Sequence, residues 1–145
     1  MLIRFRPDVI ALKPKVVVIL AGTNDIAGNT GRSTQEMIQD NIISMLDLAE
    51  FNKIRVVLVS VLPAYDYWWQ PAMEPAEKIV ALNAWLKDYA AKRGIVYVDC
   101  HTPMSDEKHA MKKELSPDGV HPNAAGFALM SPLVEAGIEQ ALKRP

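Results

Sequence analysis

This sequence contains one cysteine, no strong excess of either charge and no long hydrophobic run, and each of these absences excludes a class of protein. With Cys100 as the only cysteine, the chain cannot carry an intrachain disulfide. We expect Cys100 to be a small buried residue at the end of a strand rather than a reactive thiol. The 16 basic and 17 acidic residues are interspersed, so no basic patch points to nucleic acid or to a charged membrane surface.

Neither membrane insertion nor the common cofactors are indicated. The longest strongly apolar run, from Val16 to Ala21, is far too short to span a bilayer. No signal-peptide pattern opens the chain, which therefore reads as cytoplasmic as given, while a longer parent protein is compatible with secretion. A phosphate loop, a dinucleotide fingerprint and metal ligands at suitable spacing are all missing, and we expect no cofactor and no metal.

What the sequence does contain is a regular alternation of apolar strands and amphipathic helices. Three apolar, β-branched runs are nearly continuous, as is typical of strands covered on both faces in a parallel sheet: 16–22, 55–62 and 95–100. The first dozen residues look like the end of a helix, with Val9, Ile10 and Leu12 on its buried side.

Two helices are expected between these strands. Ser33 and Glu36 form a capping-box pattern that opens the first helix. The second helix begins near Pro75 and stops at Gly94, which suits the residue after a helix end. The apolar residues of both helices fall at helical spacing: Ile38, Ile42, Met45, Leu46 and Ala49 in the first, and Ile79, Leu82, Leu86 and Tyr89 in the second.

A last helix is expected over about 124–142. Pro132 lies inside it, and a proline in a helix interior removes a hydrogen bond and crowds the preceding turn. We therefore expect Pro132 to break or kink this helix, with Ser131 available to cap its second part.

The order of these elements predicts a single α/β domain. Strands that alternate with helices of this length indicate a doubly wound parallel sheet with helices on both faces. Residues 1–145 form one domain in this interpretation, because the chain has neither internal repeats nor a low-complexity linker. The long irregular stretch 63–74 follows the carboxyl end of the second strand, and in open α/β sheets that end faces the ligand crevice.

A short polar motif near the last helix is the first candidate for chemistry. The string from Asp118 to Asn123 places His121 three residues after Asp118 on a tight Asp-Gly turn. Histidine is suited to proton transfer near neutral pH, and a carboxylate beside it fixes its tautomer and orientation. The alternative is an ordinary surface turn in which His121 is merely exposed.

The second motif, Gly22-Thr23-Asn24-Asp25, follows the first strand. Asn24 comes where a side-chain amide can point into the crevice and donate a hydrogen bond to an oxyanion. The alternative is a polar turn in which Asn24 and Asp25 cap backbone groups. We expect Asp25 to brace the loop rather than to react.

Together, in this order and context, the two motifs resemble the third and fifth sequence blocks of the SGNH (GDSL-type) hydrolases. The resemblance is strongest to the bacterial GDSL-like lipases and acylhydrolases related to platelet-activating-factor acetylhydrolase. It implies a flavodoxin-like fold, in which Asp118 orients His121, His121 acts as base and then as acid, and Asn24 contributes to the oxyanion hole.

The family's first block, with the nucleophilic serine, and its second block, with an oxyanion-hole glycine, have no counterpart in the chain. On this resemblance the chain holds strands 3, 4 and 5 of the family's sheet, whose order is 2-1-3-4-5, and the domain is truncated at its N-terminus. The strand at 16–22 then becomes an edge. A flat, Val-rich, uncharged edge is a template for pairing with another chain, and we expect a homodimer or a higher oligomer.

Two serines are candidates for a replacement nucleophile. Ser60 lies near the carboxyl end of the middle strand, and Ser116 lies on the His121 loop. Neither is on the sharp strand-to-helix turn that exposes a nucleophile in this kind of fold. The alternatives are a strand hydroxyl bonded to backbone groups for Ser60 and a turn residue for Ser116.

The irregular stretch beside the crevice supplies candidate substrate-binding residues. Trp68 and Trp69, together with Tyr65 and Tyr67, are suited to form the wall of an acyl or sugar site, and Asp25 is a further candidate. The alternative is that one ring packs beneath the loop. A carbohydrate ester is therefore the substrate suggested by these side chains.

The resulting prediction is a serine-type carboxylic ester hydrolase for a small acyl ester, without cofactor or metal, whose nucleophile block is missing from this chain. The alternative is a non-catalytic remnant that self-associates through the strand at 16–22 and binds ligands or partners. The two readings differ in whether any nucleophile completes the pair of Asp118 and His121.

Overall fold

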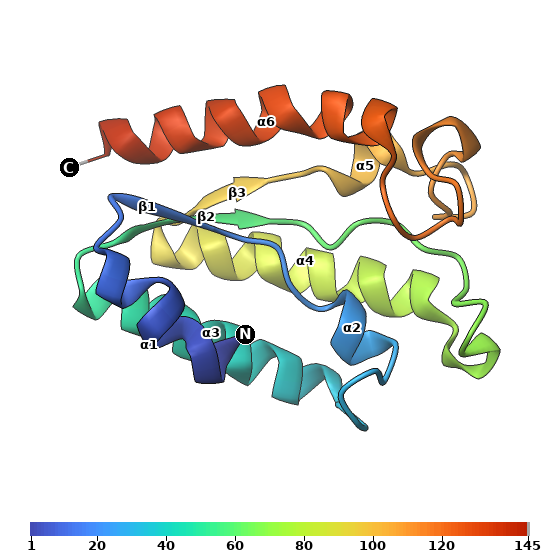
Figure 1. Cartoon of the computed structure of the whole chain (residues 1–145), viewed down its shortest axis with the longest axis horizontal. Coiled ribbons are helices and arrows are strands. Elements are labelled where there is room, and N and C mark those ends of the chain that lie inside the picture. The colour runs from blue at the N-terminus through green and yellow to red at the C-terminus, as the bar shows by residue number, and fades with distance from the viewer. Residues whose placement is uncertain (145) are drawn as a thin grey trace.

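The computed structural model describes residues 1–144 and has three layers, with one sheet between two layers of helices (Figure 1). Its strands and helices are α1 (Phe5–Asp8), β1 (Val16–Ile19), α2 (Thr23–Ile26), α3 (Gln35–Phe51), β2 (Arg55–Val59), α4 (Pro75–Arg93), β3 (Val96–Val98), α5 (His101–Met104) and α6 (Ala124–Lys143). The three strands are parallel, in the order β1-β2-β3. The predicted α/β fold with a three-stranded parallel sheet is confirmed. Among residues 1–144, no helix has both the length and the apolarity that crossing a membrane requires.

The central strand β2 divides the core into two halves. Val56 and Leu58 face α3 and α4, while Val57 and Val59 face the side covered by α6. Because side chains alternate between the two faces of a strand and both faces are covered, all four residues are buried. This explains why β2 reads as a continuous apolar run in the sequence.

The strands are shorter than the apolar runs that predicted them. β1 ends at Ile19, three residues before the predicted limit, and the chain enters the short helix α2 through Gly22. Gly22 has φ 127°, and a Cβ atom there would lie 3.0 Å from Leu82 and 3.1 Å from Val61. Only glycine fits this conformation and this close approach without strain. The resulting turn carries Asn24 toward the carboxyl end of the sheet.

The helix caps confirm one prediction and correct another. Pro75 opens α4, and Gly94, with φ 65°, ends it as predicted. The capping-box prediction at Ser33 is wrong, because α3 starts one residue later: Thr34 has an extended backbone, and its Oγ1 accepts a hydrogen bond from the backbone N–H of Met37 (3.3 Å).

The last helix, α6, continues through Pro132, so the expected break and the second cap at Ser131 are wrong. The missing N–H of Pro132 leaves the carbonyl of Ala128 without its helical partner, and both residues are exposed, so that carbonyl is open to solvent. The hydroxyl of Ser131 donates instead to the carbonyl of Phe127 (2.8 Å). The helix remains a single element that covers one face of the sheet.

The N-terminal segment is an irregular helical stretch against the core. Val9 and Ile10 pack against buried residues, as predicted. The prediction for Leu12 is wrong, because its side chain is 74% exposed. The chain turns there from a 3₁₀ helix into the lead-in to β1, which removes the regular spacing on which the prediction relied.

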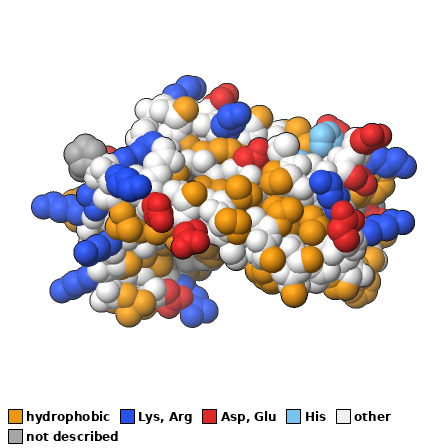
Figure 2. Space-filling model, turned by 90° about the horizontal axis from the view of Figure 1, so that it is seen from above, with side chains coloured by type: hydrophobic (Ala, Val, Ile, Leu, Met, Phe, Trp, Pro, Cys, Tyr) orange, Lys and Arg blue, Asp and Glu red, His pale blue; other side chains and the backbone are white. Residues whose placement is uncertain are grey.

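One side of β1 lacks a neighbouring strand, and the face next to it is apolar. Within residues 1–144, β1 pairs only with β2, and Val18 and Leu20 are each more than one third exposed. Phe127 and Leu133 on α6 are exposed as well. Seen from the side of α6, hydrophobic side chains gather across the middle of the molecule (Figure 2). Contiguous apolar surface of this kind marks a place where something else packs.

Candidate active site

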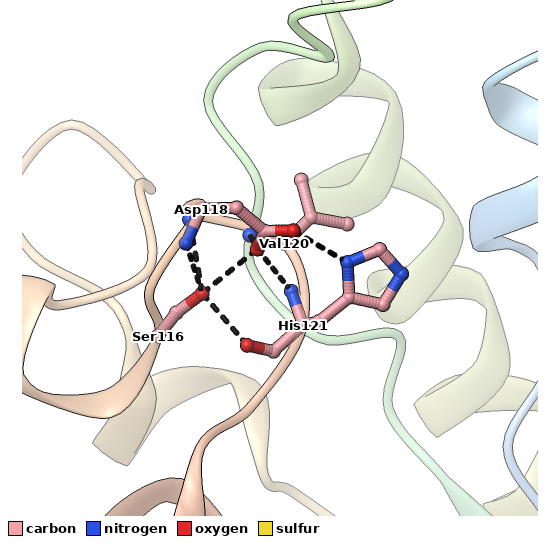
Figure 3. Close-up of polar contacts among 5 residues, drawn as sticks. Ser116, Asp118, Val120 and His121 are labelled. Atoms are coloured by element: carbon pink, nitrogen blue, oxygen red, sulfur yellow. Dashed lines mark hydrogen bonds and ion pairs between the residues drawn. The ribbon is translucent and has the colours of Figure 1, made fainter.

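The loop between α5 and α6 holds the aspartate and the histidine side by side. The Nδ1 atom of His121 lies 2.7 Å from Oδ2 of Asp118. The other carboxylate oxygen of Asp118 accepts the backbone N–H groups of Val120 (3.0 Å) and His121 (2.8 Å). The aspartate is therefore fixed by the same turn that presents the imidazole, and the second ring nitrogen of His121 points away from the loop (Figure 3).

Ser116 holds this turn closed. Its hydroxyl donates to the backbone carbonyl of His121 (2.8 Å) and accepts the backbone N–H of Gly119 (2.9 Å). The hydroxyl thus lies on the backbone side of the histidine, near Asp118 and away from the free ring nitrogen. This is the turn role that the sequence offered as its alternative reading.

The loop is attached to the start of α6 by Asn123 and Gly126. The side chain of Asn123 caps α6 by accepting the backbone N–H groups of Ala125 and Gly126, and its amide donates to the carbonyl of Glu114 (2.9 Å). A Cβ atom on Gly126 would lie 2.7 Å from the carbonyl of Leu115. The close approach therefore requires glycine, and the helix and the histidine loop form one unit.

Hydrogen bonds keep Asp118 ionised. The backbone N–H of His121, the imidazole of His121, the backbone N–H of Val120 and the hydroxyl of Ser116 together hold the pKa of the Asp118 carboxyl well below its usual range. Burial acts in the other direction, but it is outweighed by the two hydrogen bonds from His121. An ionised Asp118 accepts a hydrogen bond from the N–H group at Nδ1 of His121, which leaves Nε2 of His121 free to act as a base.

This depressed pKa predicts how the loop responds to acid. Because the folded-state pKa lies below the unfolded value of about 3.9, Asp118 contributes stability above that value and loses it as the pH falls toward the folded pKa. We expect the ¹³C resonance of the Asp118 carboxylate to show the ionised form at pH values where an ordinary aspartate is half protonated. A titration midpoint at or above about 3.9 would contradict the hydrogen-bond pattern described here.

Asn24 lies in α2 at the same end of the sheet and is connected to His121 through an aromatic residue. Its side-chain oxygen accepts a hydrogen bond from Asn29 (2.9 Å), whose own oxygen accepts the indole N–H of Trp69 (2.9 Å). The Trp69 ring stacks near His121, with ring centroids 6.5 Å apart and an angle of 26° between the planes. The structure therefore brings Asn24, Trp69 and His121 into one cluster.

The sequence did not identify Asn29 as part of this cluster. Its only visible signal was a polar residue shortly after the Gly-Thr-Asn-Asp motif. Since the pairing of Asn29 with Trp69 joins positions 40 residues apart, no local pattern could have revealed it.

The other aromatic candidates divide between exposed and buried positions. Trp68 is 72% exposed and Tyr65 is 57% exposed, so both rings are open to a ligand. Tyr67 is fully buried, packs 5.1 Å from Trp69 and donates its hydroxyl to the carbonyl of Thr23 (3.3 Å). Tyr67 thus holds the loop from beneath, next to α2.

Ser60 and Asp25 lie apart from the imidazole. Ser60 is fully buried, and its hydroxyl accepts the backbone N–H groups of Cys100 (2.9 Å) and His101 (2.8 Å). Asp25 lines a cavity of about 550 Å³ between α3 and α4, to which neither Asn24 nor His121 contributes. Within residues 1–144, no hydrogen bond joins a serine hydroxyl to the ring of His121.

Neither the cysteine nor the other histidines form a metal centre in the part of the chain that the structure describes, where no three His, Cys, Asp or Glu side chains are grouped to hold an ion. Cys100 is fully buried, and burial raises the pKa of its thiol to about 11, so it is a structural residue as predicted.

Fold and site together define an α/β protein with an ionised carboxylate, an oriented imidazole and a side-chain amide at the carboxyl edge of a parallel sheet. The model of the GDSL-like lipase/acylhydrolase family matches residues 1–129. A GDSL-like lipase from Bacteroides thetaiotaomicron is 44% identical and has a TM-score of 0.93; the match covers 97% of this chain and 69% of that protein. The chain therefore belongs to the GDSL-like lipase/acylhydrolase family.

Two more distant relatives are acetylxylan esterases. The enzyme from Xylanibacter ruminicola is 26% identical, and the match covers 91% of this chain but only 30% of that enzyme's length. A catalytic mutant of Axe2, an acetylxylan esterase from Geobacillus stearothermophilus, is 22% identical, with a TM-score of 0.74 and coverage of 99% of this chain and 68% of that one. The second likeness establishes the shared fold.

Proposed function

We propose that this protein is a serine-type carboxylic ester hydrolase in which Asp118, His121 and Asn24 carry three of the catalytic roles. A serine hydroxyl attacks the acyl carbonyl while Nε2 of His121 takes its proton, and the same proton later passes to the leaving alcohol. Asp118 holds the imidazole in the required tautomer. The Nδ2 group of Asn24 donates to the oxygen that becomes negatively charged.

The observation that carries the proposal is the 2.7 Å contact between Nδ1 of His121 and an Asp118 carboxylate whose pKa is depressed. The relatives add support. Catalytic mutants of the Geobacillus acetylxylan esterase replace a serine, an aspartate and a histidine, and the last two are three positions apart in that enzyme, as Asp118 and His121 are here. In the proposal the serine comes from outside the 145 residues, because Ser60 and Ser116 are bonded to backbone groups.

For the substrate we propose a small acyl ester of a carbohydrate. Trp68 and Tyr65 present exposed rings on the loop that also carries Trp69 beside His121. Aromatic faces of this kind pack against the apolar faces of sugars while their polar edges remain in water. Two relatives are named for acetylxylan, an acetyl ester in which the alcohol half is a sugar.

The first test is hydrolysis of p-nitrophenyl acetate by the purified chain beside His121→Ala, with His109→Ala as the matched control. We expect any hydrolysis to disappear in His121→Ala and to persist in His109→Ala, since both changes remove an imidazole and only His121 is paired with an ionised carboxylate. Measurable hydrolysis that is equal in all three proteins would contradict the roles proposed here. Release of acetate from an acetylated xylose then tests the alcohol half.

We also propose that the chain associates with a second copy through β1. The strand has a free edge within residues 1–144, Val18 and Leu20 expose apolar side chains beside it, and Phe127 and Leu133 on α6 add further exposed apolar surface. Unpaired backbone groups and apolar surface at one place favour the addition of another strand.

A charge on the free edge tests this association. We expect Val18→Lys to shift the chain toward the monomeric mass in analytical ultracentrifugation at micromolar concentration, because burying an ammonium group between two strands is costly. Leu12→Lys makes the same change at an exposed apolar residue away from β1 and is expected to leave the mass unchanged. A monomeric mass for the unsubstituted chain would refute the proposal.

A further inference from the structure

Three side chains from separate segments form a hydrogen-bonded series that ends at Asn24. Nε1 of Trp69 donates to Oδ1 of Asn29 (2.9 Å), and Nδ2 of Asn29 donates to Oδ1 of Asn24 (2.9 Å). Trp69 lies on the loop after β2, Asn29 on the turn after α2 and Asn24 within α2. The backbone N–H of Asn29 also donates to the carbonyl of Asn24 (3.0 Å), which closes the turn between them.

The direction of this series follows from the chemistry of the indole. An indole N–H is only a donor, so the group of Asn29 that faces Trp69 must be its carbonyl oxygen. The NH₂ group of Asn29 is then turned toward Asn24, and an NH₂ group requires an acceptor. Consequently the oxygen of Asn24 faces Asn29, and the NH₂ group of Asn24 is left on the other side of the amide.

We propose that Trp69 and Asn29 are positioning residues that orient the Asn24 amide so that its N–H groups, and not its oxygen, face the reacting ester. This inference rests on the proposed function, in which Asn24 donates to the developing oxyanion. A reversed amide would place a carbonyl oxygen against that negative charge and would oppose the reaction. Because an asparagine amide can adopt either orientation, a donor of this kind needs a partner that fixes one of them.

The Trp69 ring also lies beside the base. Its ring stacks near His121 at 6.5 Å and is itself held by Tyr67 (5.1 Å) and by Trp68 (5.3 Å) between ring centroids. One side chain therefore sets the position of the base through its ring and the direction of the oxyanion donor through its N–H. General-base and oxyanion groups act together only when their relative geometry is fixed to within fractions of an ångström.

The sharpest test is Asn29→Asp, which keeps one half of the series and reverses the other. The new carboxylate still accepts the indole N–H of Trp69, but it has no donor for Asn24. We therefore expect the Asn24 amide to turn and to donate its NH₂ group to the carboxylate. In the ¹⁵N-labelled chain, this change is expected to slow the hydrogen exchange of the Asn24 side-chain amide, which is exposed in the unsubstituted protein.

Two further variants distinguish the loss of this hydrogen-bonded series from general damage to the loop. Trp69→Phe keeps a ring beside His121 but removes the donor, and we expect it to release the Asn24 amide from its single orientation. Trp85→Phe makes the same chemical change on an indole of α4 that stacks on Tyr89, and it is expected to leave the Asn24 signal unchanged. A merely structural role for Asn29 would lower the unfolding midpoint without slowing exchange at Asn24.

The proposal is overturned if exchange at Asn24 is the same in Asn29→Asp and in the unsubstituted chain, or if Trp85→Phe changes it as much as Trp69→Phe does. In any form of the protein that hydrolyses the ester, Asn29→Asp is expected to lower kcat by about 10²- to 10³-fold with little change in KM, as for loss of one oxyanion donor. The exchange measurement needs no ester, so it tests the hydrogen-bonded series by itself. The proposed function is tested separately, by His121→Ala.

Discussion

In a form of the protein that carries the serine, Asp118→Asn is expected to lower ester hydrolysis by about 10⁴-fold, the loss found when the aspartate of a catalytic triad becomes an amide. The oxygen of the new amide still accepts the backbone N–H groups of Val120 and His121, so the loop keeps its shape. The NH₂ group, however, faces Nδ1 of His121, where the carboxylate now stands at 2.7 Å. Nδ1 must then be unprotonated, the proton moves to Nε2, and Nε2 no longer accepts a proton from a hydroxyl.

Two measurements check this expectation. The ¹⁵N shifts of the His121 ring report the tautomer directly in the 145-residue chain, and kcat/KM for p-nitrophenyl acetate reports its consequence for the reaction. Asp66→Asn is the matched control, because it makes the same change on an exposed carboxylate of the loop after β2. A ring that keeps its proton on Nδ1 in Asp118→Asn would contradict the assignment of Asp118 as the orienting group.

The largest expected effect on stability comes from Gly137→Leu in α6. Gly137 is buried where the helix crosses the sheet, and a Cβ atom there would lie 2.5 Å from a methyl carbon of Val98 and 3.2 Å from one of Val57. Both valines belong to the buried core beneath α6, so neither side chain can move aside. Overpacking of this kind costs up to about 3 kcal/mol and occasionally more, which is a large fraction of the stability of a small domain.

Ala136→Leu is the control for this substitution. It places leucine on the next residue of the same helix, at an exposed position, where we expect a change within about 0.5 kcal/mol. Urea unfolding of the two variants, followed by circular dichroism, gives the difference in their midpoints. Equal midpoints would mean that α6 does not sit on the sheet at Gly137 as the structure describes.

The fold was predictable because its main signals are local in the sequence. The continuous apolar character of β2 and the spacing of Ile79, Leu82 and Leu86 each follow from burial on one or both faces of a single element. The errors occurred where a local rule has more than one outcome. Pro132 is tolerated because its unpaired carbonyl faces water, and Thr34 caps α3 in place of its neighbour Ser33.

The candidate site was predictable only in part. Asp118 and His121 were identified because they lie three positions apart on one tight turn. The structure places Nδ1 of His121 2.7 Å from Oδ2 of Asp118. The catalytic roles of these residues and of Asn24 remain predictions. Asn29 was not identified, since its contact with Trp69 depends on how two distant loops pack, which no pattern in a single segment encodes.

The register of the sheet also has a consequence for the order in which the chain folds. In the sheet, Val16 of β1 is paired with Arg55 of β2, and Val57 of β2 is paired with Val96 of β3. The two strand pairings therefore join residues at the same separation along the chain. Closing the two loops therefore costs about the same conformational entropy. The preference between them comes from burial, which is nearly complete for β2 and β3 and partial for β1. We expect β1 to dock last during folding and, in native-state hydrogen exchange, to be the strand that opens at the lowest free energy.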